Sequence, residues 1–102
     1  MTLDSFSKTV KNILPDFSLL TSDNIVQNKG MWTWTDLRVK ALDTINPDND
    51  IVVERLGMKS SWSKIAYKIT LYQNSKEVVS LTNSNLKAML SSFNNLLNFK
   101  RI

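Results

Sequence analysis

The chain has 102 residues, a formal charge of +4, and neither cysteine nor histidine. This length fits a single domain over residues 1–102, large enough to bury one hydrophobic core without disulfide bonds. The missing cysteine and histidine exclude thiolate and imidazole metal ligands and any nucleophile that histidine activates. The mild positive charge favours anionic partners.

The chain shows no signal for secretion or membrane insertion. Its first residues lack the basic start and apolar stretch of a signal peptide. No apolar run approaches the roughly 20 residues that a helix needs to span a bilayer. We therefore expect a soluble, cytoplasmic protein with no membrane partner.

The first expected element is a helix that ends before Pro15. Apolar residues recur at helical spacing in this segment, namely Leu3, Phe6, Val10, Ile13 and Leu14. Pro15 should end the helix because the residue before a proline is pushed out of the helical region. Residues 16–30 show no firm period, so we expect a loop there, with at most a short strand.

Four strands are expected next, separated by segments rich in turn-forming residues. They are Met31–Asp43, Ile51–Leu56, Trp62–Tyr72 and Glu77–Leu81. A final helix follows, with Thr82 or Asn83 as its N-cap. The predicted fold is α+β: a twisted antiparallel four-stranded β-meander flanked by an N-terminal helix and a longer C-terminal helix.

The final helix carries a continuous apolar stripe with two possible roles. The stripe includes Leu86, Met89, Leu90, Phe93 and Leu97. Packing on the sheet is the commoner outcome, but stripes of this kind also form seams between subunits. We expect a homo-oligomer, a dimer or a tetramer, with these five residues at its interface.

Two of the expected strands separate apolar side chains from aromatic and basic ones. Successive side chains of a strand point to opposite faces, and the odd-numbered residues of both strands are largely apolar. The even-numbered residues include rings and cations: Trp32, Trp34, Arg38, Lys40, Trp62, Lys64, Lys68 and Tyr72. Asp36 is the single acid expected among them. Rings that stack on bases, among cations that neutralise phosphates, suit single-stranded nucleic acid, DNA more than RNA.

Other interpretations of this face stay open. Tryptophan is mostly buried in proteins, so another element or a second subunit could cover the rings. The rings also suit a protein partner, as in a small phage inhibitor of a host enzyme or defence complex, or in a phage structural subunit. A slip of one residue in register would exchange the two faces.

No pattern in the chain indicates catalysis. The acidic residues form no pair typical of acid–base chemistry. Asp43, Asn46, Asp48 and Asp50 lack the spacing of a calcium loop, and Gly30 and Gly57 lie too far apart for a phosphate-binding loop. We expect no enzyme, no cofactor and no metal site.

Three segments are similar to one known family. Val79–Leu97 looks like a final strand and helix, Trp34–Leu42 like an aromatic and basic strand, and Ile69–Lys76 like a last hairpin. Together they resemble the Whirly family and the related coactivator-type single-stranded-DNA-binding proteins, although the family's Lys-Gly-Lys-rich strand is missing. The resemblance implies sheets that bind single strands with little sequence preference and a terminal helix that assists oligomer assembly.

Overall fold

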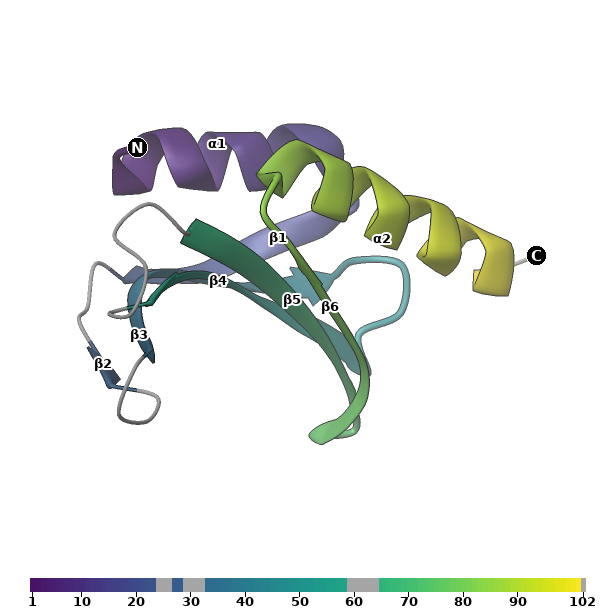
Figure 1. The fold of residues 1–102 in the computed structure, drawn as a ribbon. Coiled ribbons are helices and arrows are strands. Elements are labelled where there is room, and N and C mark those ends of the chain that lie inside the picture. The colour runs from purple at the N-terminus through teal and green to yellow at the C-terminus, as the bar shows by residue number, and fades with distance from the viewer. Residues whose placement is uncertain (24–26, 29–32, 59–64, 102) are drawn as a thin grey trace.

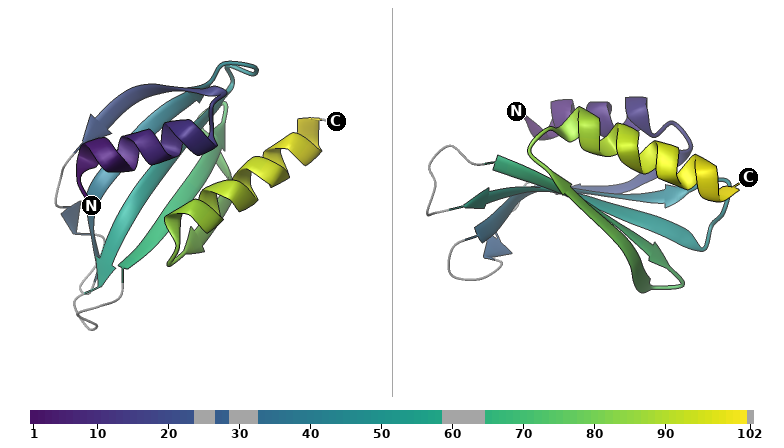
Figure 2. Two further views of the ribbon diagram at one scale, coloured as in Figure 1. Left: turned by 90° about the horizontal axis from the view of Figure 1, so that it is seen from above. Right: turned by 45° about the vertical axis from the view of Figure 1, so that its right-hand side comes forward.

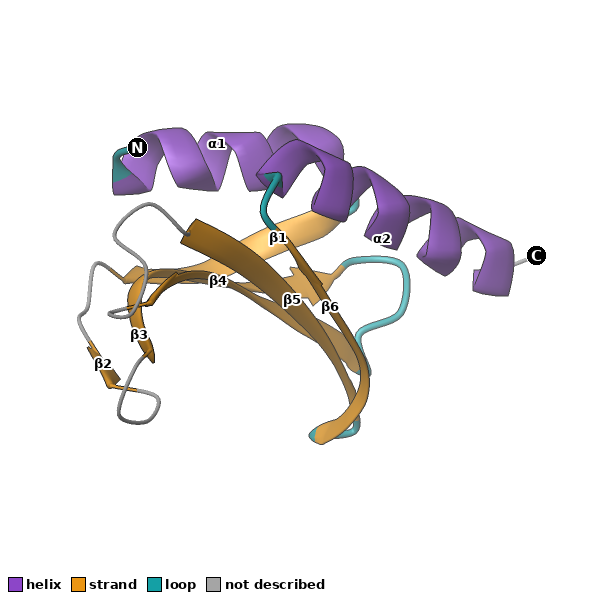
Figure 3. Ribbon diagram, viewed as in Figure 1, coloured by secondary structure: helices purple, strands orange, loops and turns teal. Residues whose placement is uncertain are grey.

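The computed structural model describes residues 1–23, 27–28, 33–58 and 65–101. Two helices lie on one side of a single antiparallel sheet, which confirms the predicted α+β class (Figure 1, Figure 3). The elements in chain order are α1 (Leu3–Ile13), β1 (Phe17–Asp23), β2 (Gln27–Asn28), β3 (Thr33–Asp43), β4 (Asn49–Met58), β5 (Ile65–Gln73), β6 (Lys76–Asn83) and α2 (Leu86–Arg101).

The strand order in the sheet is β1-β3-β4-β5-β6, and the short β2 also pairs with β3. The prediction of four strands is therefore wrong, because part of the expected loop forms β1 along the free side of β3. β1 runs antiparallel to β3, from Phe17 opposite Asp43 to Asp23 opposite Arg38. Its register shifts between Leu19 and Thr21. Such a bulge breaks the alternation of side chains by which a strand is recognised in sequence.

Both helices begin at a polar cap. The Thr2 hydroxyl accepts the Ser5 N–H at 3.1 Å, and α1 ends before Pro15 as predicted. At α2 the cap is Asn85, whose Oδ1 accepts the Ala88 N–H at 3.0 Å. The prediction of Thr82 or Asn83 as the N-cap is wrong.

The hydrophobic core lies between the helices and the sheet. Its strand residues lie mainly at the odd-numbered, apolar positions; the cluster is Phe6, Val10, Leu14, Phe17, Leu37, Val39, Ala41, Ile51, Val53, Ile69, Leu71, Leu86, Met89, Leu90, Phe93 and Leu97. The two helices lie side by side over different strands, α1 against β1 and β3, and α2 against β5 and β6 (Figure 2). Neither helix in the described ranges is long and apolar enough to span a bilayer.

The apolar stripe of α2 belongs to this core. Each of its five predicted interface residues is at most 4% exposed within the single chain: Leu86, Met89, Leu90, Phe93 and Leu97. A second copy of the chain has no access to these side chains. The prediction that they form an oligomer interface is therefore wrong, because they are already packed on the protomer's own sheet and α1.

Candidate nucleic-acid interface on the open face of the sheet

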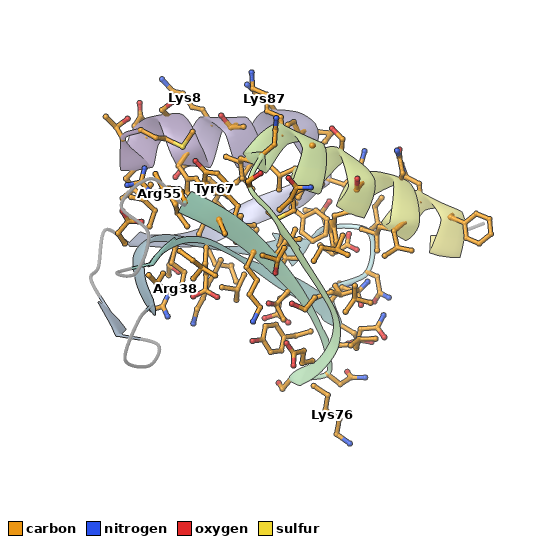
Figure 4. All side chains as sticks on the ribbon, in the orientation of Figure 1. Lys8, Arg38, Arg55, Tyr67, Lys76 and Lys87 are labelled. Carbon is orange, nitrogen blue, oxygen red and sulfur yellow. The ribbon has the colours of Figure 1, made fainter. Side chains whose placement is uncertain are left out.

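The sheet face turned away from the helices, called the open face below, is lined mainly by even-numbered residues. The sheet bends so that its hollow side is this face (Figure 1). Arg38 of β3 lies opposite Glu54 of β4, which in turn lies opposite Lys68 of β5. Arg38 appears below the sheet, whereas Lys8 and Lys87 project from the helices above it (Figure 4).

Two further rows of paired residues cross the open face. Lys40 lies opposite Val52, which is paired with Thr70. In the next row Asp50 lies opposite Tyr72. The structure thus brings Arg38, Lys40, Lys68 and Tyr72 to one face, the arrangement that their alternation in the sequence predicts.

A β-bulge removes Asp36 from this face. The register of β3 and β4 shifts between Thr35 and Leu37, so that Asp36 is the extra residue and Leu37 lies opposite Arg55. Asp36 binds Arg55 on the helix side, and Thr35 joins the open face, where its hydroxyl donates to Glu54 Oε2 at 3.2 Å. The prediction that Asp36 shares a face with Arg38 and Lys40 is wrong.

The bulge also affects the predicted tryptophan pair. The backbone of Trp34 pairs with Gly57. Gly57 is two residues from Arg55 on β4, so this position belongs to the face of Arg55 and not to that of Glu54. The alternation that grouped Trp34 with Arg38 therefore does not continue through the bulge. The side chain of Trp34, and all of Trp32, Trp62 and Lys64, lie outside the described part of the chain.

A hollow of about 310 Å³ lies on the open face where the β5–β6 hairpin curves under the sheet. It is lined by Arg38, Lys40, Asp50, Val52, Glu54, Tyr72 and Ser75. Tyr72 and Asp50 are half-buried there, and Lys40 is exposed. A ring, cations and carboxylates therefore meet in one concavity.

The charge of this face differs from the expectation. Among residues whose side chains the structure describes, the paired rows of β3, β4 and β5 hold three cations (Arg38, Lys40 and Lys68) and two acids (Asp50 and Glu54), and a third acid, Glu77 of β6, lies opposite Tyr72. Glu54 is only 4% exposed, although both described helices lie on the other side of the sheet. A buried carboxylate needs hydrogen bonds and opposite charges. Thr35 donates a hydrogen bond to Glu54, and Arg38 and Lys68, the two residues opposite Glu54 on the neighbouring strands, carry positive charges.

Glu54 and Asp50 belong to the site but are not among the residues predicted from the sequence. The signal was present in the expected strand Ile51–Leu56, where Val52, Glu54 and Leu56 alternate with Ile51, Val53 and Arg55. In a meander this strand lies between the two basic strands. The even-numbered residues of this middle strand must then lie between the cations of the two basic strands.

The helix side of the bulge holds a separate ion pair. Arg55 Nε donates to both carboxylate oxygens of Asp36 at 2.9 and 3.1 Å, and its Nη2 also donates to Asp36. These hydrogen bonds raise the pKa of the Arg55 guanidinium, while partial burial opposes the shift. Tyr67, opposite Arg55, stacks on Phe6 of α1 with ring centroids 6.2 Å apart. The Tyr67–Phe6 contact joins the sheet to α1. Neither this contact nor the Asp36–Arg55 ion pair is part of the open face.

Comparisons with known proteins identify no relative of this chain. No protein-family model matches it, and neither a curated protein nor a solved structure does so.

Proposed function

We propose that the open face binds single-stranded nucleic acid, DNA more than RNA, without catalysing a reaction. The observation that carries this proposal is the convergence of Arg38, Lys40, Lys68 and Tyr72 from two strands on one concave face. Cations of this kind neutralise backbone phosphates, and an aromatic ring stacks on a base. The concavity favours a thin, flexible strand over a duplex.

Stacking of bases on the tryptophans stays a prediction, and for Trp34 the bulge at Asp36 removes the support of alternation. Each stacked base contributes about 1–3 kcal/mol. Their contribution is separable from that of the cations, since stacking responds weakly to salt whereas phosphate contacts respond strongly.

A charge-matched pair of variants tests the location of the binding surface. Lys40→Gln/Lys68→Gln removes two cations from the open face, and Lys8→Gln/Lys87→Gln removes two from the helix side (Figure 4). Both double variants lower the formal charge from +4 to +2. Arg38 is kept in both, so that buried Glu54 retains a cationic neighbour.

We expect the open-face variant to bind a fluorescein-labelled dodecathymidine on the order of tenfold more weakly at about 0.1 M salt, and the helix-side variant to bind like the wild type. Fluorescence anisotropy measures both affinities. Equal losses in the two variants would mean that only net charge matters and would overturn the assignment of the face. Salt-independent binding to a protein, with no binding to the oligonucleotide, would favour the inhibitor or structural-subunit alternative.

A further inference from the structure

The hollow on the open face contains a carboxylate that backbone binding does not require. Asp50 lines the hollow, is half-buried, and lies directly opposite Tyr72. A carboxylate beside a phosphate chain is repulsive, and the mixture of Asp50 with Lys40 and Arg38 therefore does not fit a surface that holds phosphates alone. It fits a site where cations hold the backbone and an acid reads a base.

The chemistry of the carboxylate limits which base it can read. An ionised carboxylate only accepts hydrogen bonds. Guanine presents two adjacent N–H donors on its pairing edge, which match the two oxygens of one carboxylate. Thymine presents a single N–H between two carbonyl oxygens, and these oxygens repel a carboxylate. Asp50 therefore discriminates in favour of guanine.

The size and lining of the hollow fit one base. Its volume of about 310 Å³ is at the lower end of the range of ligand pockets, which begins at roughly 300 Å³. Tyr72 supplies an aromatic face for the base, and Arg38 and Lys40 line the same hollow, within reach of the flanking phosphates. Glu54 is the second acid of the hollow, but its Oε2 already accepts the Thr35 hydroxyl. Asp50 is thus the better acceptor for a ligand.

We propose that this hollow binds one unstacked guanine of a single strand, with Asp50 accepting hydrogen bonds from its pairing edge and Tyr72 packing against its ring. This inference rests on the proposed single-strand binding and adds a base preference to it. The rest of the strand is held by its backbone, so a single guanine suffices to show the preference.

The test compares two nonanucleotides, oligothymidine and the same strand with guanine at its central position. We expect the wild type to bind the guanine-containing strand on the order of tenfold tighter. Asp50→Asn should lose most of this preference and bind oligothymidine at least as well as the wild type does. Asp48→Asn is the matched control, because it removes the same charge from the adjacent exposed turn, outside the hollow, and should keep the preference.

The outcomes separate this inference from the proposed function. Equal binding of the two strands by the wild type would overturn the guanine site and leave single-strand binding intact. A preference that persists in Asp50→Asn would overturn the role of Asp50. If the wild type binds neither strand, single-strand binding fails and the guanine site fails with it.

Discussion

At the scale of single residues, the bulge at Asp36 decides which side chains share a face. One extra residue in β3 moves Asp36 to the helix side and places Thr35 beside Glu54. The negative charge of Asp36, which the alternation assigns to the open face, is paired with Arg55 on the helix side instead. Sequence alone did not reveal this bulge, because Thr35-Asp36-Leu37 continues an unbroken alternation of residue types.

The Asp36–Arg55 pair should contribute measurably to stability. Both side chains are largely buried, 24% and 19% exposed, and Arg55 makes several hydrogen bonds to the carboxylate. We expect Asp36→Asn to lower the free energy of unfolding by about 1–3 kcal/mol, measured by urea denaturation. Lys8→Gln, which removes the exposed pair with Asp4, is the control and should cost less than about 0.5 kcal/mol.

The pH dependence of this effect follows from the sign of the pKa shift. Folding raises the pKa of Arg55 through its bonds to Asp36. A raised pKa of a cation gives stability that is fully present below the unfolded pKa and is lost as the pH rises through the folded one. Both values for arginine lie above the working range, so the difference between Asp36→Asn and wild type should stay constant between about pH 6 and about pH 10. A difference that vanishes within that interval would contradict a role for ionised Arg55.

At the scale of elements, the β5–β6 hairpin shapes the hollow and contains a strained residue. Asn74 and Ser75 have φ angles of 51° and 66°, as expected for a two-residue turn between antiparallel strands. Asparagine tolerates this region, but serine adopts it at a higher energy than glycine does. Ser75 also lines the hollow, so this turn forms part of the wall of the site.

Ser75→Gly should therefore stabilise the hairpin. We expect an increase of about 0.5–1 kcal/mol in the free energy of unfolding, measured by urea denaturation. Asn74→Gly is the matched control and should give a smaller increase, because asparagine already populates the left-handed region. A loss of stability in Ser75→Gly would indicate that the serine side chain makes interactions stronger than the backbone strain.

The elements also show what the sequence predicts well and what it does not. The α1 and α2 helices and the strands β3 to β6 follow from regular apolar spacing, and their faces follow from alternation wherever no bulge intervenes. β1 was missed because its own bulge at Leu20 hides its period. The spacing of the α2 stripe is equally compatible with a core and with a subunit interface. Only tertiary packing decides between them, and the stripe belongs to the core.

At the scale of the whole molecule, the hydrophobic core lies on one side of the sheet and the proposed binding surface lies on the other. Both helices lie on one side of the sheet (Figure 2), and they form the core with the odd-numbered strand residues; the opposite side carries Arg38, Lys40, Glu54 and Lys68 beside apolar residues such as Val52. The sequence predicts the convergence of Arg38, Lys40, Lys68 and Tyr72 because alternation and the order of the meander determine it. It did not predict the bend of the sheet, which places the hairpin turn under the face and creates the hollow.

The central claim is that this face holds the phosphate backbone of a single strand. The most direct measurement is the affinity of the wild-type protein for an unstructured oligonucleotide over a series of salt concentrations, followed by fluorescence anisotropy. Three phosphate contacts, by Arg38, Lys40 and Lys68, predict that log K falls against log salt with a slope of roughly −2, or steeper if further cations take part. A slope near zero, or no binding at low salt, would contradict the claim.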